Sequence, residues 1–265
     1  MDSGEIARFI GKRVLIRKLA FLFITVTTLR EWYIRSGIRR ILKGRANFSL
    51  LDAGSGMGQH AYQVAKSFPD AKVVGIEKDA GQVRDCNAFA SKTGLKNLTF
   101  LQGDLADHKF DPFDAILCCS VLEHIREDRT VLAGFHQALK EDGHLLIYVP
   151  TSEKRVLASL ARKIHARLKK TGDQFPHEHV RYYTPEELTR KLQETGFTIE
   201  ERTITYGHYG RLAYDIVTNV QYNSLFKYIF AFYLFLVHPF VLVLMWADYL
   251  SNNKEGNGLL IIARK

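Results

Sequence analysis

The run Leu50-Leu51-Asp52-Ala53-Gly54-Ser55-Gly56-Met57-Gly58-Gln59-His60 joins an apolar segment to a glycine-rich turn. Its apolar start predicts a buried strand, and the amphipathic residues 61–66 predict a helix directly after the turn. Glycines at three alternate positions let the backbone turn sharply and bring its N–H groups close to a ligand. The run therefore predicts a strand–turn–helix unit with a ligand site at the turn.

A second strand follows this helix and ends in an acid. Residues 72–76 are largely apolar and lead into Glu77, about twenty residues past the turn, where an acid can accept hydrogen bonds from ribose hydroxyls. Strand-like and helix-like segments then alternate, which predicts an α/β fold with helices on both faces of a mostly parallel sheet. Strands are expected at 48–53, 72–77, 97–101, 113–119, 143–149, 197–206 and 258–264, and helices at 58–67, 79–92, 123–140 and 184–195.

The glycine pattern is Gly-x-Gly-x-Gly, which differs from the dinucleotide-binding form Gly-x-Gly-x-x-Gly. In this pattern, and through Gly103-Asp104, 113–124 and 139–147, the chain resembles the class I S-adenosylmethionine (SAM) methyltransferases. The resemblance implies a Rossmann-like seven-stranded sheet, mostly parallel with an antiparallel edge strand. It also pairs 197–206 with 258–264 as an antiparallel hairpin at the sheet edge.

The same resemblance implies which residues hold the cofactor, S-adenosyl-L-methionine. The acid before the glycines, the three glycines and the serine after the fourth strand would lie at its methionine end. The acid ending the second strand would hold the ribose, and the remaining residues would surround the adenine. The full set is Asp52, Gly54, Gly56, Gly58, Glu77, Lys78, Asp104, Leu105 and Ser120. An acid near the positively charged sulfonium is electrostatically favourable. For the acids at strand ends, a solvated side chain is the plainer alternative.

Candidate acid–base residues are Glu123 and three histidines. His124 follows the fourth strand beside Glu123, and His177 and His179 lie in the loop before the helix expected at 184–195. Histidine titrates near neutral pH, so it can take a proton from an acceptor or orient it. A histidine that only starts a helix is an equally good interpretation of His124. No metal site is expected, because the spacing around Glu178 lacks the i, i+4 pattern and a third ligand.

The composition points to an anionic partner. The 265 residues carry a formal charge of +9 with a pI near 9.4, which favours nucleic acid or an anionic membrane surface without distinguishing them. Enzymes that methylate nucleic-acid bases carry Asn/Asp-Pro-Pro-aromatic or Pro-Cys motifs, whereas residues 118–122 read Cys-Cys-Ser-Val-Leu. Nucleic acid is therefore the less expected partner. The three cysteines lack metal or disulfide spacing and are expected to be reduced core or near-core residues of a cytosolic protein.

Two segments outside the minimal fold carry basic and apolar residues together. Residues 1–46 precede the methyltransferase-like domain at 47–265 and predict a basic, apolar-faced helix. That helix would cover the cofactor site, lie on a membrane or simply pack on the core. An insert at 151–172 contains a basic amphipathic helix at 154–170, a pattern that suits anionic lipid and also occurs in ordinary solvated helices.

A second insert, at 210–256, is apolar. Its residues 228–247 contain no acid, lysine or arginine and are long enough for a membrane span. One crossing would separate two strands of the same sheet, and Pro239 interrupts the run. We therefore expect two short helices, at about 222–237 and 240–250, forming a hairpin in one leaflet. A helical cap on the domain or on a dimer partner stays open.

Together these features predict a SAM-dependent methyltransferase that transfers a methyl group, by SN2 attack, to a hydrophobic or lipid-linked small molecule at a membrane surface. An isoprenoid quinone precursor, a phospholipid head group and a lipid-linked sugar are the acceptor classes considered. The expected location is cytoplasmic, peripheral or monotopic on the cytoplasmic face of an anionic membrane. Two alternatives remain: a soluble RNA or protein methyltransferase whose insert serves in homo-oligomers, and a catalytically silent SAM-fold partner at the membrane.

Overall fold

The computed structural model describes residues 14–107, 110–152, 154, 156, 180–221 and 233–265. A seven-stranded sheet runs through them in the order β3-β2-β1-β4-β5-β7-β6. Neighbouring strands pair in parallel except β7, which is antiparallel to both β5 and the edge strand β6. The predicted mostly parallel α/β fold and the antiparallel hairpin at the edge are confirmed. The strands are β1 Ser49–Ala53, β2 Lys72–Glu77, β3 Leu98–Gln102, β4 Phe113–Cys119, β5 Leu139–Pro150, β6 Thr198–Thr205 and β7 Gly258–Arg264.

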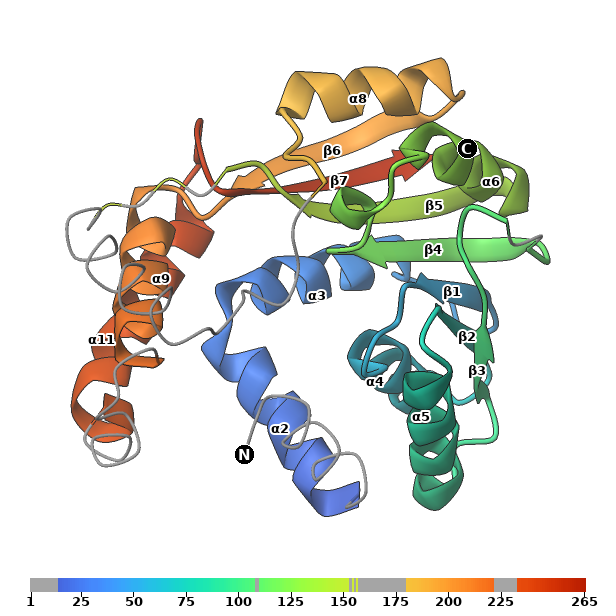
Figure 1. Cartoon of the computed structure of the whole chain (residues 1–265), viewed down its shortest axis with the longest axis horizontal. Coiled ribbons are helices and arrows are strands. Elements are labelled where there is room, and N and C mark those ends of the chain that lie inside the picture. Colours follow the sequence, from blue (N-terminus) through green and yellow to red (C-terminus); the bar gives the residue numbers. More distant parts are fainter. Residues whose placement is uncertain (1–13, 108–109, 153, 155, 157–179, 222–232) are drawn as a thin grey trace.

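Helices cover both faces of this sheet (Figure 1). One core lies beneath α3, α4 and α5, with Ile34, Tyr62 and Phe89 buried in it. The other lies beneath α6 and α8, with Phe135 and Leu188 fully buried. The helical elements are α2 Val14–Thr27, α3 Leu29–Ile41, α4 Gln59–Ser67, α5 Ala80–Thr93, η1 Leu122–His124, α6 Asp128–Ala138, α8 Pro185–Glu194, α9 His208–Gln221, η2 Tyr233–Val237 and α11 His238–Leu250.

Helix α3 lies before the first strand in sequence but packs directly on the sheet. At Gly37 the approach is so close that an added Cβ would lie 2.5 Å from Leu146 Cδ1 of β5. The start of α3 reaches the turn after β4, where Arg30 Nη1 donates to Ser120 Oγ at 3.3 Å. Helix α2 continues from α3 away from the sheet (Figure 1). The N-terminal helices thus bring their own side chains to the carboxyl ends of the strands.

The expected helix at 123–140 is wrong in its boundaries. A single 3-10 turn, Leu122–His124, is followed by extended backbone at Ile125, and α6 begins only at Asp128. A long-range hydrogen bond competes with a regular helix here, because Val180 N donates to the carbonyl of Glu123 at 2.9 Å. Strand β5 begins at Leu139, four residues before the expected start at 143, and pairs there with Phe113 ahead of a bulge.

The apolar insert contributes α9 and α11, which pack against each other. Helix α11 begins at His238 and has Pro239 in its first turn. It agrees with the second helix expected at 240–250. Most of the expected first helix, and most of the basic helix expected at 154–170, lie outside the described residues. Within the described ranges, every helix falls short of the length and apolarity needed to span a bilayer.

Candidate active site

The glycine-rich turn between β1 and α4 has a backbone suited to glycine. Gly54, Gly56 and Gly58 have φ values of +75°, +51° and +74°, which other residues rarely adopt. A Cβ on Gly54 would lie 2.5 Å from Val121 Cγ2, and one on Gly58 would lie 2.6 Å from Phe100 Cζ. A Cβ on Gly56 would meet nothing nearer than 3.9 Å. The turn is packed tightly at its flanks and open at its centre, where a ligand can approach the backbone.

Glu77, at the end of β2, is held against this open centre by backbone amides. Its Oε2 accepts from Gly56 N at 2.9 Å, and its Oε1 accepts from Lys78 N at 2.8 Å and from Asp79 N at 3.1 Å. Three amides therefore fix the carboxylate in place. Its role in holding a ribose stays a prediction, and its position beside the turn fits that role.

The residues expected around the adenine meet at the ends of β2 and β3. Lys78 Nζ lies 2.8 Å from Asp104 Oδ2, and the hydrogen bond from Lys78 lowers the pKa of Asp104. Leu105 is buried in the core beneath α6. Lys78 directly follows Glu77, whose carboxylate accepts from Gly56 N of the glycine-rich turn, so these residues lie near that turn. Their contact with adenine stays a prediction.

The expected methionine end carries a buried cluster of charged groups. Asp52 is only 2% exposed, its Oδ2 accepts from Ala61 N at 3.1 Å, and burial raises the pKa of its carboxyl group. Glu31 of α3 lies close by, with its Oε2 2.9 Å from His60 Nε2 and 3.0 Å from Gln59 Nε2. Glu31 is absent from the predicted site. A signal existed in the sequence, since it is the only acid between Glu5 and Asp52.

A cavity of about 370 Å³ lies where β4 and β5 end, next to this cluster. It contains two predicted residues, Ser120 and His124, together with side chains from α3, β5 and α9. Its lining is Arg30, Ser120, Glu123, His124, Tyr148, Pro150, Ser152, Tyr206, Tyr214 and Asn257. A larger cavity, of about 510 Å³, lies along β2 and β3 and is lined by none of the predicted site residues. The smaller cavity is therefore the candidate acceptor pocket.

Glu123 is the unusual group in this pocket. It is 1% exposed, its Oε2 has no hydrogen-bond partner among the described residues, and burial raises its pKa to about 7. His124 lies beside it, with Nε2 4.0 Å from Glu123 Oε1. His177 and His179, the other predicted catalytic residues, fall outside the described residues. A buried carboxylate that titrates near neutral pH can accept a proton from a bound acceptor.

Comparison with known proteins identifies the family. A family model described as a methyltransferase domain matches residues 45–196, which is more than half of the chain. The chain belongs to this methyltransferase family. The methyltransferase is 28% identical, over 180 residues, to the ubiquinone biosynthesis O-methyltransferase of Vibrio parahaemolyticus, a match that covers 66% of this chain and 74% of the relative.

Solved structures agree on the fold of the methyltransferase. The phosphoethanolamine N-methyltransferase 2 of Haemonchus contortus, solved with SAM, aligns with a TM-score of 0.60 at 18% identity, over 88% of this chain and 52% of that chain. The [4+2]-cyclase SpnF aligns with a TM-score of 0.59 at 20% identity, over 88% and 80%. The family match and the neighbours together support the predicted cofactor, SAM. The open glycine-rich turn and the fixed carboxylate of Glu77 fit that group.

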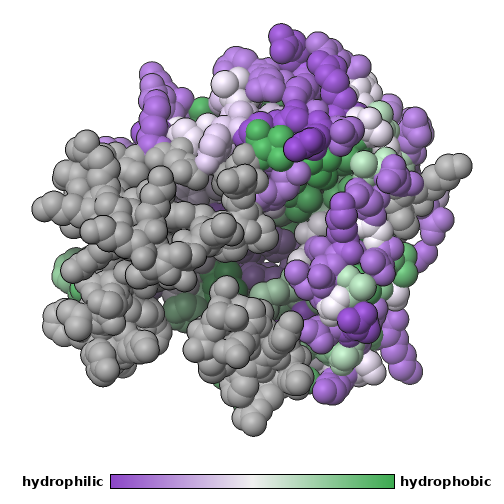
Figure 2. Space-filling view, in the orientation of Figure 1, coloured by the Kyte–Doolittle hydropathy of each residue, from purple (hydrophilic) through white to green (hydrophobic). Residues whose placement is uncertain are grey.

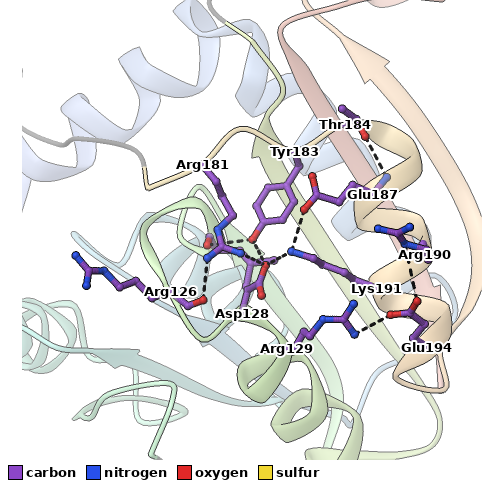
Figure 3. A network of polar contacts seen from close by, with 11 residues as sticks. Arg126, Asp128, Arg129, Arg181, Tyr183, Thr184, Glu187, Arg190, Lys191 and Glu194 are labelled. Atoms are coloured by element: carbon purple, nitrogen blue, oxygen red, sulfur yellow. Dashed lines mark hydrogen bonds and ion pairs between the residues drawn. The ribbon is translucent and has the colours of Figure 1, made fainter.

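In the methyltransferase, the turn carrying Glu123 is fastened by the segment that leads into α8. Val180 N donates to the carbonyl of Glu123, and Arg181 Nη2 donates to the carbonyl of Arg126 at 2.8 Å. Three donors then converge on one oxygen, Asp128 Oδ2, in the network drawn in Figure 3. They are Arg181 Nη1 at 2.7 Å, Tyr183 Oη at 2.8 Å and Lys191 Nζ at 2.6 Å.

Replacing Asp128 by alanine should lower the free energy of unfolding by about 3–5 kcal/mol, because Lys191 would remain buried without its main partner. Burial opposes ionisation of Asp128, but hydrogen bonds from Lys191 and Tyr183 outweigh it and lower the pKa. The contribution is therefore present at neutral pH and is lost as the pH falls through that lowered pKa, so variant and wild type should converge in acid.

Denaturant unfolding of both proteins measures this difference. Glu194→Ala is the matched control, since Glu194 pairs with Arg129 and Arg190 at the surface of the same region. Its removal should cost at most about 1 kcal/mol. Equal losses in the two variants would contradict the assigned importance of the Asp128 network.

Proposed function

We propose that this methyltransferase transfers the methyl group of SAM to a hydroxyl of a hydrophobic or lipid-linked small molecule at a membrane surface. The observation that carries the proposal is the buried Oε2 of Glu123, which has no partner among the described residues, in an aromatic-lined pocket. Val121, next to the pocket residue Ser120 in the chain, packs against Gly54 of the glycine-rich turn. An O-methyltransferase among the relatives supports a hydroxyl acceptor.

The chemistry divides between cofactor and chain. SAM, when bound, would supply an electrophilic methyl carbon for the acceptor oxygen, with S-adenosylhomocysteine as the leaving product. The chain holds the acceptor in the pocket and removes the proton that its hydroxyl loses. Burial raises the pKa of Tyr206 to about 12 and also raises that of Tyr148, so both phenols keep their protons at neutral pH. We assign the proton to Glu123, whose Oε2 is buried without a partner among the described residues. His124, which also lines the pocket beside it, stays the second candidate base.

The size and lining of the pocket favour a ring-sized head with an apolar extension. About 370 Å³ lies at the small end of the usual range for small-molecule sites, roughly 300–1,000 Å³. Tyr148, Pro150, Tyr206 and Tyr214 supply apolar surface. A long isoprenoid or acyl tail would extend beyond this volume.

Exposed apolar side chains support attachment to a membrane. Among the described residues, Leu15, Leu19, Leu22, Phe23 and Val26 are exposed on α2, and Phe240, Val243, Trp246 and Leu250 on α11. Apolar patches of this kind mark interaction sites. Hydrophilic residues dominate the top and right of the view in Figure 2, whereas α11 lies at the lower left and α2 reaches the bottom of the view in Figure 1. This arrangement, with the charge of +9, supports peripheral or monotopic attachment to anionic lipid.

Replacing Phe240 and Trp246 by glutamate should weaken binding to vesicles of phosphatidylcholine and phosphatidylglycerol by about tenfold or more per site. Each ring loses apolar contact worth roughly 1.5–3 kcal/mol when fully buried. Vesicle flotation measures the effect. Leu101→Glu, at an exposed leucine of β3, is the control that should float like the wild type. Unchanged flotation of the double variant would contradict attachment through α11.

The test of the function is a methyl-transfer assay with radiolabelled SAM. The purified full chain is offered phenols and alcohols with isoprenoid tails in detergent micelles, total RNA and an unfolded protein mixture in parallel. Label should enter the lipid-soluble fraction as an O-methyl ether, identified by mass spectrometry. Label in RNA or protein would contradict the proposal, and SAM binding without transfer to any acceptor would favour a catalytically silent partner.

A further inference from the structure

One wall of the candidate acceptor pocket is a pair of tyrosines from outside the family-matched residues. Tyr206 directly follows β6, and Tyr214 lies in α9 of the apolar insert. Their ring centroids are 6.0 Å apart, and the ring planes are perpendicular at 90°. Two perpendicular rings form a corner in which a third flat ring can stack on one and meet the edge of the other.

The backbone of Tyr206 is in a strained conformation. Its φ is +54°, a left-handed conformation that is strained for a bulky residue. Its hydroxyl accepts from Arg30 N at 3.1 Å, which ties the ring to the start of α3. Ser120, another pocket residue, also has a positive φ, of 58°. Such strain persists only where the surrounding structure enforces it, and strained residues cluster at functional sites.

Polar side chains on one side of the pocket are already occupied. Asn257 Oδ1 accepts from Ser152 Oγ at 2.9 Å and from Arg211 Nε at 2.9 Å. Asn257 Nδ2 donates to the carbonyl of Lys154 at 2.7 Å. The amide has therefore committed both its oxygen and its nitrogen to the protein, which leaves it little capacity for a ligand.

Two hydroxyl oxygens of the pocket also have partners in the protein. Tyr148 Oη pairs with Thr205 Oγ1 at 3.0 Å, and Ser120 Oγ accepts from Arg30 Nη1. Within the part of the chain that the structure describes, Glu123 Oε2 is the one buried side-chain oxygen of the pocket without a partner. A sugar or a phospholipid head group brings several polar groups, each costly to bury unpaired. A flat ring with one reacting hydroxyl brings the one donor that this oxygen needs.

We propose that Tyr206 and Tyr214 are specificity-determining residues that select an aromatic hydroxyl compound, a phenol or a catechol, as the head of the acceptor. The ring lies in the corner of the two tyrosines, and its hydroxyl donates to Glu123. The choice of a hydroxyl head rests on the proposed function. The selection for an aromatic ring rests on the tyrosine corner and on the partners that Asn257, Tyr148 and Ser120 already have in the protein.

Calorimetric titrations of the full chain with S-adenosylhomocysteine bound test this selection. The probes are catechol, its saturated analogue cyclohexanediol, and methyl glucoside. Catechol should bind about threefold to tenfold more tightly than cyclohexanediol, the range expected for one favourable aromatic contact. Methyl glucoside should bind more weakly than catechol. This comparison uses the wild type alone, so it does not depend on the folding of a variant.

Tyr214→Leu should remove the preference for catechol while cyclohexanediol still binds. Tyr209→Leu is the matched control, because Tyr209 lies on the same helix and is 45% exposed against 44% for Tyr214, but does not line the pocket. The control should keep the wild-type preference. Unchanged S-adenosylhomocysteine affinity verifies that each variant is folded.

Several results would overturn the proposal. Equal binding of catechol and cyclohexanediol, tighter binding of methyl glucoside, no binding of any probe, or a preference that survives Tyr214→Leu would each do so. Failure of the proposed function is a separate result. An enzyme that prefers catechol but methylates no hydroxyl would contradict methyl transfer and leave the aromatic selection standing.

Discussion

Glu123→Gln should lower kcat for methyl transfer by about 10²–10⁴-fold while leaving the affinity for S-adenosylhomocysteine unchanged. Glutamine has nearly the same shape but cannot accept the proton of the acceptor. The wild-type carboxylate can, because its Oε2 is unpartnered and burial raises its pKa to about 7. Steady-state kinetics with a phenolic acceptor, alongside calorimetry with S-adenosylhomocysteine, measures both quantities.

The pH dependence gives a second readout of the same residue. A base must be ionised to act, so wild-type activity should rise as the pH increases through about 7, and this limb should vanish in Glu123→Gln. Between the ordinary glutamate pKa of 4.5 and the raised pKa of about 7, Glu123 keeps its proton in the folded state but loses it in the unfolded chain. Wild-type stability should therefore fall as the pH rises from about 4.5 to about 7, and the variant should lack this fall.

Glu127→Gln is the control for this prediction, since Glu127 is exposed and lies only four positions further along the chain. It should retain wild-type kcat and the wild-type pH profile. A Glu123→Gln enzyme with full activity at neutral pH would refute the assignment of the base.

Gly54→Ala should lower methyl transfer by about 10²-fold and weaken S-adenosylhomocysteine binding. The left-handed φ of +75° costs a non-glycine residue about 1–2 kcal/mol. The new Cβ would also lie 2.5 Å and 2.7 Å from the two methyl carbons of Val121, so the turn or Val121 must move. A displacement near 1 Å at a positioning element can cost about 10²-fold in rate.

Gly94→Ala distinguishes the conformational cost of a positive φ from the effect of the steric contact with Val121. Gly94 has φ +74° at the end of α5, and a Cβ there would meet nothing within 4 Å. It should lose about 1 kcal/mol of stability and keep wild-type cofactor binding. Thermal unfolding and calorimetry compare the two variants. If both lost cofactor affinity equally, the close approach of Gly54 to Val121 would not be the cause.

Much of the fold was predictable because its signals are local. Element boundaries are predicted within a few residues by three local signals. These are the apolar run before Gly54, the acid that ends β2 and the proline at the start of α11. The helix expected at 123–140 failed for the opposite reason. Its interruption depends on Val180, which is distant in sequence and bonds to the carbonyl of Glu123.

The site was only partly predictable. The residues around the glycine-rich turn follow from motif spacing, and the structure places them together. Arg30, Glu31, Tyr206 and Tyr214 were missed, because α3, the end of β6 and α9 reach the pocket only through tertiary packing. Neither periodicity nor motif spacing indicates that Arg30 and Glu31 lie near Tyr206 and Tyr214, which follow them by more than 170 residues.

Calorimetric titration of the purified full chain with S-adenosylhomocysteine tests the central claim most directly. We expect a saturable heat of binding with one site per chain, and loss of that heat in Asp52→Ala while the sheet stays folded. A folded wild-type protein that binds neither S-adenosylhomocysteine nor SAM would contradict the cofactor site, and with it the methyltransferase activity.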